Sequence, residues 1–121
     1  MYIDGEETVS NLAALQSIIT DINSLIDSLL EDNTLDVIFK KYMLSMLYNL
    51  RESCENYLFN GGTGVRDTVY ASAGRIREIL KEYENVESYK KYLANAKNVI
   101  TNVATAVNIV QAGVFLFQIG T

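Results

Sequence analysis

The chain of 121 residues contains no proline, and this absence limits the secondary structure that it can adopt. Proline breaks the interior of a helix, because its ring removes a backbone donor and clashes with the preceding turn. Three of the seven glycines lie together at 61, 62 and 64, so the rest of the chain carries few residues that end a helix. We therefore expect long helices and little else, which is an all-α fold.

The apolar residues of the first predicted helix repeat at steps of three and four, which is the spacing of one buried helical face. They are Leu12, Leu15, Ile19, Ile22, Ile26 and Leu29. Patterns of this kind and the turn signals between them predict helices over about residues 9–31, 35–59, 65–84 and 89–119. Short connections favour antiparallel neighbours. We expect a single domain over 1–121, an up-down antiparallel four-helix bundle with a long apolar C-terminal helix.

The last 24 residues, 98–121, carry no charged side chain and form the most apolar part of the sequence. As a helix, residues 99–119 would be about 31 Å long, roughly the thickness of the hydrocarbon core of a bilayer. Neutral polar residues nevertheless recur along one side, at Thr101, Asn102, Thr105, Asn108 and Gln111. We expect this stripe to face water while the opposite side is buried, at Val99, Val103, Ala106, Val110 and Phe117. The alternative is a membrane-active or membrane-anchored helix over 98–121.

The net charge of −5 is unevenly distributed. Residues 1–39 hold eight acidic residues and no Lys or Arg, whereas residues 40–121 hold ten basic and seven acidic residues. The first helix has a candidate acidic face at Asp21, Asp27 and Glu31, and the third helix has a basic side at Arg66, Arg75, Arg77 and Lys81. These two sides could pair inside the bundle, or either could meet a partner protein or a second subunit. We expect no nucleic-acid partner, because phosphate binding needs a clustered positive face.

Three of the eight tyrosines, Tyr83, Tyr89 and Tyr92, lie near the predicted turn between the third and fourth helices. Tyrosine is enriched at protein interfaces, and its amphipathic ring is also found where a core meets solvent. The sequence leaves both interpretations open. The candidate partner contacts are therefore the basic residues of the third helix together with these tyrosines.

The chain has no histidine, which excludes several kinds of active site. Ser-His-Asp and Cys-His nucleophile systems and histidine-containing zinc sites all require that residue. We expect the single cysteine, Cys54, to be a buried structural thiol, since no base is available to activate it. The glycine-rich run at 61–64 lacks the spacing and the lysine of a phosphate-binding loop, and we expect it to be a helix break. We expect no enzyme activity, no metal and no cofactor.

The second predicted helix carries apolar residues around most of its circumference, more than two neighbouring helices can cover. This excess, the segregated charge and the missing catalytic set predict a non-catalytic protein that binds another protein and self-associates as a homo-oligomer. Small inhibitors, immunity proteins and adaptor or assembly subunits share this profile. A lone cysteine suits a reducing compartment, so we expect a cytoplasmic location, or a membrane-associated one under the alternative.

Overall fold

A computed structural model describes residues 5–60, 63–83 and 86–107, and these residues form four helices. They are α1 (Gly5–Glu31), α2 (Val37–Asn60), α3 (Thr63–Tyr83) and α4 (Glu87–Ala106). The described ranges contain no strand. The predicted all-α four-helix bundle is therefore confirmed.

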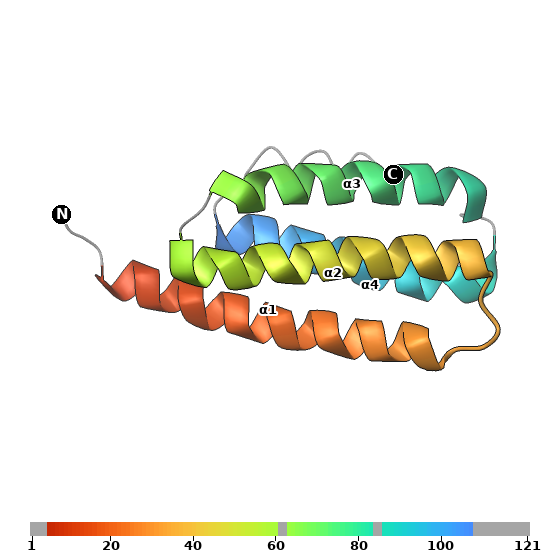
Figure 1. Cartoon of the computed structure of the whole chain (residues 1–121), viewed down its shortest axis with the longest axis horizontal. Helices are drawn as coiled ribbons and strands as arrows, with labels where there is room; N and C mark the ends of the chain where they lie inside the picture. The colour runs from red at the N-terminus through yellow and green to blue at the C-terminus, as the bar shows by residue number, and fades with distance from the viewer. Residues whose placement is uncertain (1–4, 61–62, 84–85, 108–121) are drawn as a thin grey trace.

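Each helix of the bundle packs beside the helices that precede and follow it in the chain (Figure 1). α1 and α3 both pack on α2 and on α4. Within the described residues α1 and α3 lie diagonally opposite without backbone contact, while α2 and α4 approach each other across the centre. The interpretation that the basic side of α3 pairs with the acidic face of α1 is therefore wrong, because other helices separate the two.

The apolar face of α1 enters the core much as its spacing predicts. Leu15, Ile22, Ile26 and Leu29 are buried, and Ile19 is half-buried at the edge of the core. Burying side chains of this size contributes about 1.5–3 kcal/mol each relative to leaving them in water. The four helices are therefore held together mainly by this shared apolar interior.

The described part of α4 follows the predicted division between a buried and a solvated side. Val99 and Val103 are buried, Ala106 is half-buried, and Asn102 and Thr105 are exposed. The helix ends at Ala106, and the N–H of the next residue still donates to the carbonyl of Val103 at 3.0 Å. The expected continuation over 108–119 lies outside the described residues. Among the helices that the structure describes, none is long and apolar enough to cross a membrane.

Tyrosine hydroxyls and acidic residues close the end of the bundle that holds the α1–α2 and α3–α4 turns. The hydroxyl of Tyr92 donates to Asp32 at 2.6 Å, and that of Tyr83 donates to Asp36 at 3.0 Å. The backbone N–H of Asp36 donates to the hydroxyl of Tyr89 at 2.6 Å. Together with a central phenylalanine these residues form what we call the turn end: Asp32, Asp36, Phe39, Tyr83, Tyr89 and Tyr92.

The aromatic rings of the turn end stack on one another. The Phe39 ring is fully buried, and its centroid lies 4.3 Å from that of Tyr89 and 5.0 Å from that of Tyr83. Tyr89 and Tyr92 are buried, so their interpretation as exposed partner contacts is wrong and their interpretation as core residues at a bundle end holds. The reason is that each ring is apolar enough to enter the core while its hydroxyl still reaches a partner at the edge.

Candidate functional site

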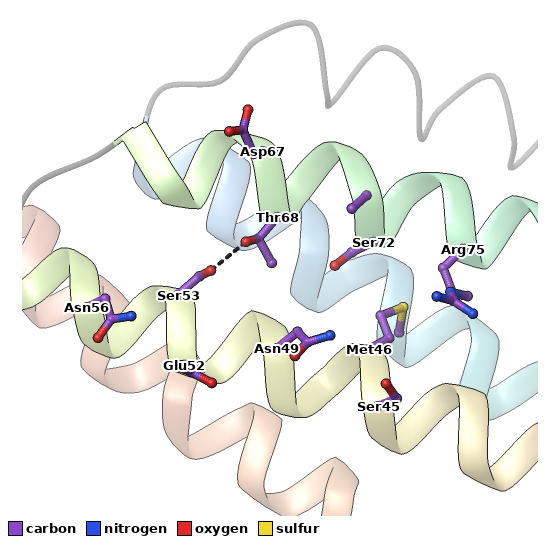
Figure 2. Close-up of a pocket in the computed structure, with 11 residues that line it drawn as sticks. Ser45, Met46, Asn49, Glu52, Ser53, Asn56, Asp67, Thr68, Ser72 and Arg75 are labelled. Carbon is purple, nitrogen blue, oxygen red and sulfur yellow. Dashed lines mark hydrogen bonds between the residues drawn. The ribbon is translucent and has the colours of Figure 1, made fainter.

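A cavity of about 430 Å³ opens between α2 and α3 (Figure 2). This volume lies within the range of about 300–1,000 Å³ that is typical of ligand pockets. We call the cavity the α2–α3 groove. Its lining comprises Ser45, Met46, Asn49, Glu52, Ser53 and Asn56 from α2, and Asp67, Thr68, Ala71, Ser72 and Arg75 from α3.

The groove exists because two neighbouring helices face each other with short side chains. Ser45, Asn49 and Ser53 recur every four residues on α2, and Thr68 and Ser72 do so on α3. Residues four apart lie on the same side of a helix, so each helix carries a stripe of short polar groups. The helices pack through the larger apolar residues beneath these stripes, and the short side chains leave a hollow above them.

Ser72 forms part of the floor of the groove. The residue is only 3% exposed, and apart from the tyrosines it is the one residue with a polar side chain that is buried within the described ranges. Its hydroxyl has no hydrogen-bond partner within the described residues, and it points into the groove in Figure 2. Buried polar groups are almost always paired, because an unpaired one loses its bonds to water without replacement. Such an unpaired hydroxyl is therefore a candidate ligand contact.

A hydrogen bond and a ring contact connect the two walls of the groove. Within the groove the hydroxyl oxygens of Ser53 and Thr68 lie 2.5 Å apart and link α2 to α3 (Figure 2). At one end the Arg75 guanidinium carbon lies 5.3 Å from the centre of the Tyr42 ring, which is within the range of a cation–π contact. Both contacts connect α2 with α3 and hold the walls of the groove in place.

Acidic side chains outnumber basic ones along the groove. Glu52 and Asp67 line it, against Arg75 as the one basic residue in the lining. A smaller cavity of about 150 Å³ adjoins it and shares Arg75; it adds two further carboxylates, Glu78 and Glu82. All four carboxylates lie on exposed residues. The residues that line the two cavities therefore include four carboxylates and one guanidinium group, and that guanidinium lies over the ring of Tyr42.

The described residues include no group of three or more Cys, Asp or Glu residues that could hold a metal ion. Cys54 is fully buried, as predicted, and burial raises the pKa of its thiol to about 12, with a further contribution from the charge of Glu55. A thiol with such a pKa stays protonated near neutral pH and is a poor nucleophile. The groove is suited to binding through hydrogen bonds and charge.

The structure separates the residues that the sequence grouped as candidate partner contacts. Arg75 lines both cavities and Tyr83 lines the smaller one, whereas the remaining basic residues of α3 are exposed but line neither: Arg66, Arg77 and Lys81. The candidate acidic face of α1 is exposed, at Asp21, Asp27 and Glu31, on a helix that does not contact α3. Of the predicted set, only Arg75 therefore lines the groove, and Tyr83 lines the adjoining smaller cavity.

Sequence reasoning missed the polar residues that define the groove. Glu52, Glu78 and Glu82 are exposed, which fits the expected solvated surface charge, but the sequence alone did not show that they share one surface with Ser72. The usable signal was the stripe of short side chains on each of two consecutive helices.

Comparison with known proteins adds no further assignment, because no family model, curated protein or solved structure matches this chain at a significant level.

Proposed function

We propose that this protein is a non-catalytic interaction protein that binds another protein through the α2–α3 groove. The observation that supports this function best is the buried hydroxyl of Ser72, which has no partner in the described part of the chain and lies on the floor of an open polar hollow. A surface that carries an unsatisfied buried group gains stability when a partner supplies the missing hydrogen bond. The groove also extends along two helices, which suits an extended or helical segment of a partner better than a compact metabolite.

Placement of a photoreactive amino acid tests this function. We would introduce p-benzoylphenylalanine at Asn49 or Ala71, which line the groove, and at Asp21 on α1 as the control. The same polypeptide should be captured from both groove positions and not from the α1 position, and it should bind again when purified. Equal capture from all three positions, or no capture from the groove, would contradict the proposal.

We further propose self-association through an apolar patch beside the turn end. Five large apolar side chains are exposed there, near the α1–α2 and α3–α4 turns: Leu30, Val37, Ile38, Tyr42 and Val86. Val37 is 78% exposed, which is an unusual environment for a β-branched apolar side chain. Exposed apolar side chains that gather in one region often mark a protein interface.

Light scattering at two protein concentrations tests the self-association. The mass of the wild-type particle should rise with concentration, and the double variant Val37→Ser, Ile38→Ser should remain monomeric at both. Tyr48→Ser is the matched control, since Tyr48 is also exposed on α2 but lies three turns further along the helix. A wild-type protein that is strictly monomeric at both concentrations would count against this part of the proposal.

A further inference from the structure

We propose that the α2–α3 groove accepts an arginine side chain of the partner, whose guanidinium group enters the cavity above Ser72. This inference rests on the function proposed above and names the chemistry that the partner must carry. It follows from the charge of the groove, from the hydrogen-bonding capacity of its lining, and from the place of Arg75 within it.

The charge of the groove favours a cation. Glu52 and Asp67 line the larger cavity, and Glu78 and Glu82 line the adjoining one. Carboxylates that share a surface repel one another, and a positively charged ligand relieves that repulsion while it forms charge-assisted hydrogen bonds. An anionic ligand in the groove would face Glu52 and Asp67, with Arg75 as the one basic residue in the lining.

Arg75 does not fill the place of the proposed ligand. Its guanidinium is held over the ring of Tyr42, at 5.3 Å between guanidinium carbon and ring centroid. In Figure 2 it lies at one end of the groove, while Asn56 and Asp67 lie at the opposite end. The acidic end of the cavity is therefore free of a basic side chain among the residues that line it.

The lining offers acceptors at several separate positions. One cavity holds two carboxylates, two side-chain carbonyls and one unpaired hydroxyl among the described residues. They belong to Glu52 and Asp67, to Asn49 and Asn56, and to Ser72. A guanidinium group has five N–H donors in a fixed planar fork and no acceptor, so its hydrogen-bonding capacity matches a lining that is rich in acceptors. The buried Ser72 hydroxyl would gain the hydrogen bond that it lacks.

Arginine fits this lining better than the other candidate occupants. Lysine carries a compact, strongly hydrated ammonium group. Its desolvation costs more than that of a guanidinium, and its three N–H donors all belong to one nitrogen atom. An apolar helix would find only Met46 and Ala71 as apolar lining residues. A neutral polar group would form some of the same hydrogen bonds but would leave the carboxylates without a counter-charge.

An NMR titration of the full chain with N-acetyl-arginine methylamide tests the proposal. The side-chain amide signals of Asn49 and Asn56 should shift in a saturable way. The matched probe is N-acetyl-citrulline methylamide, which has nearly the same shape and lacks the charge; it should bind at least about tenfold more weakly, which corresponds to about 1.4 kcal/mol. Equal binding of the two compounds, or no saturable shift at these amides with the arginine compound, would overturn the proposal.

Three variants assign the binding to the groove. The double change Glu52→Gln, Asp67→Asn should weaken binding of the arginine compound about tenfold or more, whereas Asp21→Asn on α1 should leave it unchanged. Ser72→Ala should weaken binding several-fold without lowering the melting temperature, which separates a ligand contact from a structural role. An Asp21→Asn variant that loses as much affinity as the groove variant would show diffuse charge attraction and would overturn the proposal.

The outcomes distinguish this inference from the proposed function. Cross-linking of one partner from the groove, with no preference for the arginine compound over the citrulline compound, would refute the arginine site and leave the docking function standing. Selective binding of the arginine compound, with no partner captured from the groove, would retain the cationic site and remove the docking function.

Discussion

The turn end and the α2–α3 groove are both rich in polar side chains, but they use them in opposite ways. At the turn end, the hydroxyls of Tyr83 and Tyr92 donate to acidic side chains at 2.6–3.0 Å, and the ring of Tyr89 stacks on the buried ring of Phe39. In the groove, the polar groups line a hollow of about 430 Å³, and the buried hydroxyl of Ser72 has no partner among the described residues. Polar composition alone therefore does not mark a site. The difference lies in whether the hydrogen bonds are already made.

The largest expected effect on stability comes from removing the central aromatic ring of the turn end. Phe39→Ala should destabilise the fold by about 3–5 kcal/mol, because it removes a fully buried ring and leaves a cavity between Tyr83 and Tyr89. Chemical denaturation followed by circular dichroism measures this loss. Tyr48→Ala on the exposed side of α2 is the control and should cost less than about 1 kcal/mol. Similar losses in the two variants would show that the turn end is not a special source of stability.

A smaller effect should appear when the turn end is acidified. The hydroxyl of Thr34, followed by that of Tyr92, lowers the pKa of Asp32 to about 2 from 3.8. Since folding favours the carboxylate, the stability that it contributes is complete above pH 3.8 and is lost as the pH falls toward 2. Denaturation curves across this window should show a loss in the wild type that is reduced in Asp32→Asn.

The control for the acid experiment is Asp21→Asn, an exposed change on α1 away from the turns. It should keep the acid-induced loss of stability that the wild type shows between pH 4 and pH 2. If Asp32→Asn and Asp21→Asn had the same pH dependence as the wild type, the hydrogen bonds to Asp32 would contribute nothing measurable to folding.

The smallest expected effect is the difference in stability between alanine variants of two serines that line the groove. Ser53→Ala should cost about 1 kcal/mol, because Ser53 forms the hydrogen bond to Thr68 that links the helices. Ser72→Ala should be neutral or stabilising by up to about 1 kcal/mol, because it removes an unpaired buried hydroxyl and introduces a better helix former. Differential scanning calorimetry would resolve the sign. A Ser72→Ala variant that is less stable than Ser53→Ala would mean that the Ser72 hydroxyl is already satisfied.

The helices themselves could be predicted from the sequence, because their apolar spacing determines which face must be buried. Leu15, Ile22 and Leu29 are examples, and the missing proline and the glycine cluster indicated where helices run and end. The order of the helices around the bundle could not be predicted. A buried face such as that of Ile76 on α3 specifies that a neighbour exists without specifying which one, so the diagonal relation of α1 and α3 required the structure.

The groove was harder to predict than the fold. Ser45, Asn49 and Ser53 have the spacing and the polarity of an ordinary solvated helix face. They become a cavity only because Thr68 and Ser72 stand opposite them on α3, and that pairing depends on the rotation and register of two helices. The burial of Tyr89 could not be predicted either. An amphipathic residue enters the core only if its hydroxyl finds a hydrogen-bond partner, and the sequence does not show that the backbone N–H of Asp36 supplies one.

The most direct test of the central claim is an NMR titration with the partner polypeptide captured by cross-linking. Resonances of groove residues such as Asn49, Asn56 and Ser72 should shift on binding, while those of Phe39 and Tyr89 at the turn end should not. Shifts concentrated at the turn end, with the groove unchanged, would contradict the assignment of the groove as the docking surface.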